Sequence, residues 1–135
     1  MAISQSLRSR AVVVERTVTL AATSGTSVGP AVPAGTLVLA AGIQPLQVVP
    51  SVTTYTVNVT DGTTTFGSAL NINNVAANTI RVGTTAGLVA AADTIDAVTT
   101  ISGSPGTIRA RIFAVVVDLN ESVKAASEVD RDVLA

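Results

Sequence analysis

The chain has 135 residues, a formal net charge of −1, only 13% charged residues, and neither cysteine nor histidine. A domain of this length buries about two thirds of its unfolded surface, which is enough for one hydrophobic core. The lack of a basic cluster argues against nucleic acid as a partner, and the lack of cysteine excludes disulfides and thiolate metal sites.

Targeting and membrane signals are not evident in the sequence. The apolar stretch that starts at residue 11 is interrupted by Glu15 and Arg16, so it does not read as a signal peptide. No run reaches the roughly 18 apolar residues of a membrane helix. We therefore expect a protein that is made in a cytoplasm and has no membrane partner.

Charge is concentrated at the two ends of the chain. Residues 1–16 carry a net charge of +2 and residues 118–135 a net charge of −3, whereas residues 17–108 contain only four charged side chains. A surface with so few charges protects a free monomer poorly against association. This distribution favours an assembly subunit whose surface is covered by neighbours.

The first part of the chain predicts short strands separated by turns. Val12–Leu20 alternates between two sides and reads as the first strand. Residues 21–35 contain Pro30 and Pro33, which forbid a central strand, so we expect a surface connection with a turn at Pro33-Ala34-Gly35. Residues 37–40 are expected to form a short strand that Gly42 ends, and residues 46–49 another, unless the two segments form one bent strand.

The middle of the chain contains the clearest hairpin signal. Tyr55, Val57 and Val59 alternate with polar residues between positions 52 and 60, and the following Asp61-Gly62 predicts a turn with residues 63–66 as the returning strand. Residues 67–78 read as a long loop. Strands resume at 79–82, 87–92 and 94–101, and a tight turn occupies residues 103–106.

The last strand, residues 107–119, is the longest. Its inner face consists of Ile108, Ala110, Ile112, Ala114 and Val116, and its outer face changes from Arg109 and Arg111 to Phe113, Val115 and Val117. An outer face that becomes apolar must be covered by another strand, the chain's own tail or a neighbouring subunit. After residue 120 the periodicity fits a short amphipathic helix.

These elements predict an all-β fold with roughly eight strands. We expect a single β-sandwich or jelly-roll-like domain over residues 17–120, with an extended N-terminal arm over residues 1–16 and a C-terminal tail over residues 121–135.

Catalytic and metal sites are not expected. Asp93 and Asp96, with Asp61, are candidate oxygen ligands, but their spacing matches no calcium loop, so we interpret Asp93 as a turn cap and Asp96 as solvated. Without histidine, a serine nucleophile has only Lys124 or a carboxylate as its base. We therefore predict no enzyme, no metal and no cofactor. Arg109 and Arg111 either bind a partner carboxylate or form a solvated stripe.

The segments VTLAATSG, VPAGTLVLAAG, YTVNVTDGTTTFGSAL, AADTIDAVTT and GTIRARIFAVVVDLN together resemble small structural proteins of tailed bacteriophage virions. The resemblance covers residues 17–120 and rests on turns and strands. It implies a β-sandwich in an oligomer, commonly a homotrimer, that is attached to a capsid as a decoration or cement protein.

This resemblance leads to a functional hypothesis. We expect a protein on the capsid exterior of a virion that binds the major capsid protein across subunit joints, because attachment to several neighbours multiplies weak contacts. The alternatives are a tail-fibre or receptor-binding module and a small carbohydrate-binding β-sandwich. The predicted contact residues lie in the arm, the last strand and the tail: Leu7, Arg8, Arg10, Arg109, Arg111, Phe113, Val115, Val117, Val129, Arg131, Val133 and Leu134.

Overall fold

The computed structural model describes residues 11–119, and the regular secondary structure within this range consists of β-strands. Within this range lie eleven strands: β1 Val12–Leu20, β2 Gly25–Ser27, β3 Ala31–Val32, β4 Thr36–Pro45, β5 Thr54–Thr60, β6 Thr65–Asn71, β7 Arg81–Val82, β8 Gly87–Val89, β9 Asp93–Thr94, β10 Asp96–Ser102 and β11 Ile108–Asp118. The described range contains no helix long and apolar enough to cross a bilayer. The prediction of an all-β domain is confirmed.

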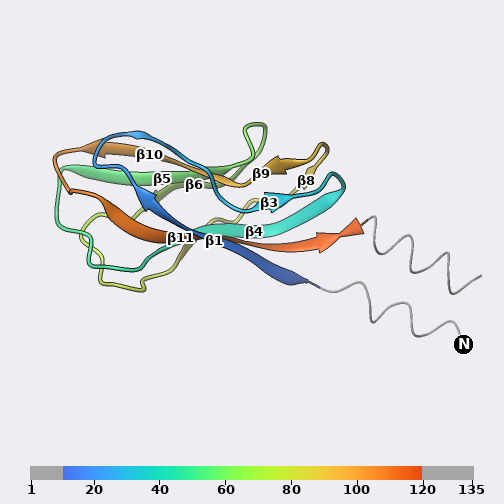
Figure 1. Ribbon diagram of the computed structural model, residues 1–135, viewed down its shortest axis with the longest axis horizontal. Coiled ribbons are helices and arrows are strands. Elements are labelled where there is room, and N and C mark those ends of the chain that lie inside the picture. The colour runs from blue at the N-terminus through green and yellow to red at the C-terminus, as the bar shows by residue number, and fades with distance from the viewer. Residues whose placement is uncertain (1–10, 120–135) are drawn as a thin grey trace, which may run out of the picture.

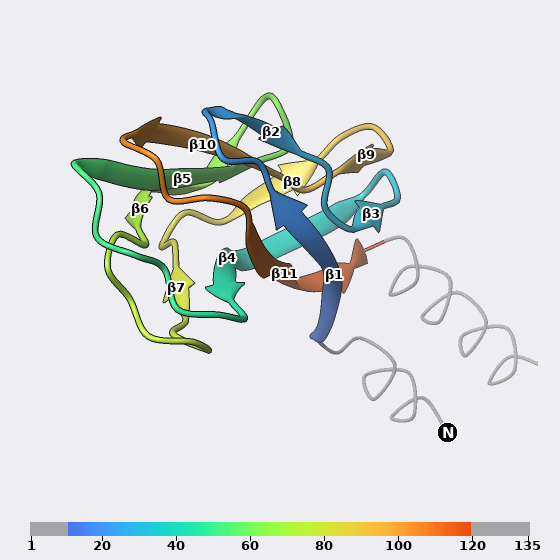
Figure 2. The same ribbon diagram turned by 60° about the vertical axis from the view of Figure 1, so that its left-hand side comes forward.

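The strands form two facing layers (Figures 1 and 2). The larger sheet has the order β1-β11-β4, and β7 and β8 both pair with the far edge of β4. The smaller sheet has the order β2-β10-β5-β6, and β3 and β9 form a separate two-stranded ribbon. All of these pairings are antiparallel.

The pairings follow a nested order along the chain. β1 pairs with β11, β2 with β10, β3 with β9 and β4 with β8, and the β5–β6 hairpin closes the series. Two further pairings, β11 with β4 and β10 with β5, join this folded-back ribbon to itself. A long antiparallel ribbon that is wound into two sheets is a jelly roll. The fold is therefore the jelly-roll form of the expected β-sandwich.

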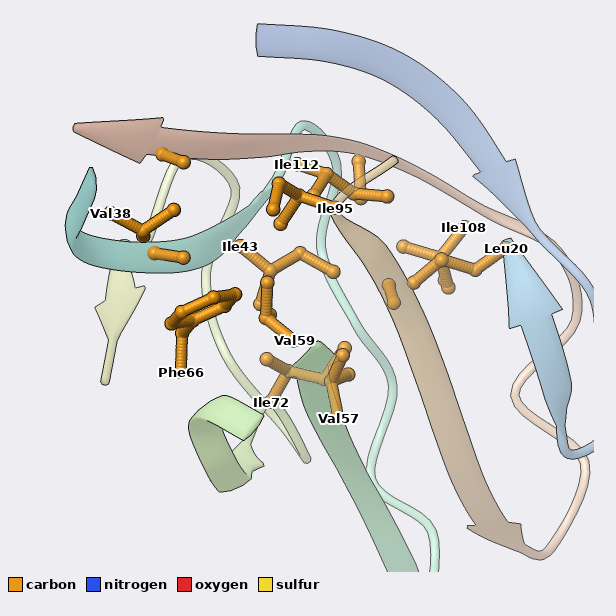
Figure 3. Close-up of a cluster of buried hydrophobic side chains, with 14 of the residues drawn as sticks. Leu20, Val38, Ile43, Val57, Val59, Phe66, Ile72, Ile95, Ile108 and Ile112 are labelled. Atoms are coloured by element: carbon orange, nitrogen blue, oxygen red, sulfur yellow. The ribbon is translucent and has the colours of Figure 1, made fainter. Parts of the chain in front are cut away.

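The hydrophobic core lies between the two sheets (Figure 3). The even-numbered residues of β11 from Ile108 to Val116 face this core, as their sequence predicts. Val57 and Val59 of β5 and Phe66 of β6 oppose them from the smaller sheet, and all three are fully buried. The core consists mainly of branched aliphatic side chains, which suit the pleated surface of a sheet.

β4 is longer than the sequence pattern indicates. It runs through Gly42 to Pro45 because a bulge reverses its alternation: Ala40 lies opposite Val115 and Val38 opposite Val116, which leaves Leu39 as the additional residue. Val38 faces the core on one side of the bulge and Ile43 on the other. The prediction that Gly42 ends this strand is wrong, since its backbone pairs with both neighbours.

Other segment predictions also need correction. Residues 21–35, for which we expected a surface connection without a central strand, contain two short strands that the sequence did not indicate: β2 at the edge of the smaller sheet and β3 in the two-stranded ribbon. The expected turn at 33–35 is present, with Gly35 at φ 83° and the Thr36 hydroxyl donating to the Pro33 carbonyl at 2.7 Å. Residues 46–49 do not form a strand, because their backbone hydrogen bonds go to loops and strand ends instead.

The hairpin prediction is confirmed, but its second strand lies further along the chain. Gly62 has φ 92°, and one carboxylate oxygen of Asp61 accepts hydrogen bonds from the Thr63 and Thr64 amides. β6 extends into the first part of the predicted 67–78 loop, as far as Asn71. Residues 12–16, which lie within the predicted N-terminal arm, pair with β11 as part of β1.

Tyr55 provides a test of the core. Its hydroxyl is buried without a hydrogen-bond partner among the described residues, and burial raises the pKa of the phenol above 10.0. Tyr55→Phe removes this unsatisfied group, so we expect the free energy of unfolding to rise by about 1 kcal/mol at neutral pH. Urea unfolding of both proteins measures the gain, and a loss of stability would show that the hydroxyl is satisfied.

The same residue predicts a dependence on alkaline pH. Because the folded state raises the phenol pKa, the native state keeps a proton that the unfolded chain releases above pH 10.0, so stability falls as the pH rises through and beyond that value. Tyr55 is the only tyrosine. The decline between about pH 9 and 11 should therefore be shallower in Tyr55→Phe, and equal declines would exclude this residue as the cause.

Candidate interface on the outer face of the larger sheet

The outer face of the larger sheet is arranged in rows of cross-strand neighbours. Residues that lie directly opposite each other in an antiparallel pair point to the same face. The odd-numbered residues of β11 face outward, since the even-numbered ones are buried in the core. Five rows result: Val117, Leu37 and Leu88; Val13, Val115 and Ala40; Glu15, Phe113, Gly42 and Val82; Thr17, Arg111 and Gln44; and Thr19 and Arg109.

These rows divide the face into an apolar and a polar half. The first two rows contain only aliphatic side chains, and the bulge residue Leu39, 41% exposed, lies next to them. Val115 and Val117 are half-buried, whereas Val13 is 60% exposed. Figures 1 and 2 show no third layer of described strands outside this sheet. An apolar area of this kind on a surface is a candidate contact site.

Phe113 covers a glycine in the third row. A Cβ atom at Gly42 would lie 2.9 Å from Cζ of Phe113 and 2.2 Å from the Arg81 carbonyl oxygen. The ring therefore occupies the space that the missing side chain leaves, which is a known way to stabilise a strand glycine. Phe113 serves the packing of β11 against β4 as well as the surface.

Arg111 lies in the polar half, where it is held by neighbours within its own sheet. Its Nε lies 3.4 Å from Oε2 of Glu15, and its Nη1 donates to Oε1 of Gln44 at 3.2 Å. These contacts tie β11 to both adjacent strands. Arg109 is exposed further along, where its backbone amide donates to Oε1 of Gln47. Arg111 therefore binds a carboxylate of this chain, whereas Arg109 presents its charge to solvent.

The structure brings together five of the predicted contact residues. Arg109, Arg111, Phe113, Val115 and Val117 share one face of β11. The other seven lie outside the described residues: Leu7, Arg8, Arg10, Val129, Arg131, Val133 and Leu134.

Sequence reasoning missed the part of this surface that comes from other strands. Val13, Leu39 and Leu88 extend the apolar half across β1, β4 and β8. In the sequence, Val13 alternates with Glu15, Thr17 and Thr19 on the more polar side of β1. Only the register with β11 shows that it joins Val115 in one row.

The fold separates Asp96 from the other two aspartates considered as metal ligands. Asp61 and Asp93 both line a cavity of about 150 Å³, but Asp96 accepts hydrogen bonds from the Gly29 amide and the Thr94 hydroxyl. Asp93 lies in strand β9, where its carboxylate accepts from the adjacent Thr94 amide, so it is a strand residue and not the expected turn cap. Asp96, which we expected to be solvated, is half-buried and fixes the end of β10. The described residues contain no group of three potential metal ligands.

The fold is similar to chains in two solved bacteriophage capsid structures. A chain of the cyanophage Pam1 capsid asymmetric unit has a TM-score of 0.63 and 14% identity, over 81% of this chain and 85% of that chain. A chain of the acidic stable capsid structure of Helicobacter pylori bacteriophage KHP30 has a TM-score of 0.52 and 14% identity, over 78% and 91%. No protein-family model and no curated protein matches the sequence. At this identity the shared property is the fold.

Gly42 allows a test of the packing beneath this surface. Gly42→Ala places a methyl group against Phe113 and the Arg81 carbonyl, so we expect a loss of about 1–3 kcal/mol in the free energy of unfolding. Gly25→Ala is the matched control, because its nearest atom beyond the adjacent residues is 4.0 Å away and its φ is not positive. Thermal unfolding compares the two, and equal stabilities would contradict the close approach.

Proposed function

We propose that this protein is a structural, non-enzymatic component of a bacteriophage virion, and that it acts as a decoration or cement subunit on the capsid exterior. The observation that carries the proposal is the apolar half of the outer face, in a jelly roll similar to chains of two phage capsid structures. In this proposal the protein is made in the host cytoplasm and binds assembled shells.

The composition supports an assembly role. Few charged side chains and an apolar surface reduce the solubility of a free subunit, and both features are tolerated when neighbours cover that surface. We propose that copies associate as a trimer through the apolar half of the larger sheet. Such a trimer contacts several major capsid subunits at once, and this multivalency strengthens contacts that are individually weak.

The aromatic residues argue against a carbohydrate-binding module. The chain has one tyrosine, two phenylalanines and no tryptophan. Tyr55 and Phe66 are fully buried in the core, and Phe113 is half-buried beside Gly42. An aromatic platform for stacking against a sugar ring is therefore not supplied by these residues. The polar half, with exposed Arg109, is the more suitable surface for a protein partner.

Leu39 provides the direct test of self-association. Leu39→Asp places a charge in the apolar half at a side chain that is already 41% exposed, so the subunit should still fold. We expect the oligomer to dissociate and shell binding to weaken by at least about tenfold, because multivalent attachment is lost. Light scattering after size exclusion measures mass, and co-sedimentation with undecorated shells measures binding.

The matched control is Val48→Asp, at an exposed valine in the loop after β4. It should keep the mass and the binding of the natural protein. Unchanged mass and binding in Leu39→Asp would contradict the assigned interface. If the natural protein saturates no shell at any concentration, or assembles closed shells by itself, the decoration role is wrong.

A further inference from the structure

β1 forms an edge of the larger sheet that no described strand covers. It runs for nine residues, and within residues 11–119 it pairs only with β11. The opposite edge of such a strand presents backbone amides and carbonyls that can accept another strand. Six of its nine residues are exposed, a large share for a segment that begins with three consecutive valines.

The core-facing side of β1 is also incompletely covered. Residues with even numbers face the smaller sheet, but Val12 is 49% exposed and Arg16 is exposed, whereas Leu20 at the other end of the strand is fully buried. Val116, which lies opposite Val12 on β11, is almost completely buried in contrast. β1 therefore extends beyond the smaller sheet at its N-terminal end, where Figure 2 shows it projecting from the two layers.

One segment outside the described range carries charged and apolar residues in an order that complements part of this edge. Residues 128–134 have the sequence EVDRDVL, and in an extended conformation Val129, Arg131 and Val133 would share one side. In an antiparallel register with Arg131 opposite Glu15, Asp130 lies opposite Arg16 and Val133 opposite Val13. Leu134 then lies opposite Val12. This register opposes two pairs of unlike charges and covers the two exposed valines.

We propose that residues 128–134 of a second copy add to the open edge of β1 as an antiparallel strand in this register. Main-chain hydrogen bonds supply the affinity of such strand addition, and the facing side chains set its register. Arg131 approaches Glu15 on the outer face beside Arg111, and Asp130 approaches Arg16 on the inner face. The larger sheet thus becomes continuous between subunits.

Two alternatives fit the edge less well. In the first alternative, residues 128–134 of the same chain pair with β1. They would then run parallel to β11, and only residues 119–127 would connect the two strands. Crossover connections between parallel strands take a dozen residues or more. A second copy of β1 is also a poorer partner. Its register of greatest overlap, centred on residue 16, opposes Arg16 to Arg16, and the next register towards the exposed valines, centred on residue 15, opposes Glu15 to Glu15.

Cysteine cross-linking tests the proposal in a protein that has no cysteine of its own. Full-length Val13→Cys and Val133→Cys chains that carry tags of different mass are co-expressed and mildly oxidised. Opposite residues of an added strand bring their Cβ atoms within about 5 Å, near the range of a disulfide, so we expect a mixed dimer that reducing agent separates. The control pairs Val13→Cys with Asp132→Cys, whose side chain faces the other side, and should cross-link at least about tenfold less.

The outcomes are distinct. A mixed dimer no stronger than the control overturns the register. An internal cross-link in the Val13→Cys, Val133→Cys double variant, without mixed dimers, assigns the strand to the same chain and also overturns the proposal. Thermal unfolding checks that the cysteine variants are folded.

Charge exchange tests the register independently. Asp130→Arg opposes two arginines, so we expect the concentration for half-dissociation of the oligomer to rise about two- to fivefold. Adding Arg16→Asp should restore it, and failure to restore it contradicts the pairing. These measurements use the isolated protein. They therefore separate a failure of strand addition from a failure of the proposed shell binding.

Discussion

The structure depends on the antiparallel pairing of β11 with a partner on each side. β1 and β4 lie along its two edges, so its backbone groups are satisfied on both, and its side chains alternate between the core and the outer face. This one strand therefore places Ile112 in the core and Phe113 on the surface. A one-residue shift in register would exchange these faces, which ties the surface to the core.

The outer face receives its chemistry from that register. Rows of aliphatic side chains gather at the end where β1 begins and β11 ends, and the Glu15–Arg111 pair lies in the polar half. An exposed ion pair adds little stability, but it makes the two halves chemically distinct. A subunit with one apolar and one polar half can associate with its own kind through the first and keep the second for a different partner.

In the proposed strand addition, the edge of β1 adds a second kind of contact. Face-to-face packing uses apolar area, which sets no strict register, whereas strand addition uses main-chain hydrogen bonds and opposite charges that specify one alignment. Glu15 and Arg16 interrupt the valines of this edge, and charges at such positions limit indiscriminate pairing between edges. The same two residues that discourage random association therefore select a complementary segment.

Local sequence signals were sufficient to predict four features. Alternation predicted the all-β class, the strand β1 and the inner face of β11, and a turn dipeptide predicted the Asp61-Gly62 hairpin. Each rests on contacts within a few residues or on a period-two pattern that the chain itself displays. Strands β2 and β3 were missed because two or three residues show no period, and their pairing with β10 and β9 is the reason that they are extended. Gly42 was misread because a local rule ends a strand at glycine. The strand continues through it, and glycine is required there because β7 and the ring of Phe113 lie too close for a side chain. The apolar half joins Val13 to Val115 and Leu37 to Leu88, and only the pairing of segments far apart in the chain decides which side chains share a row.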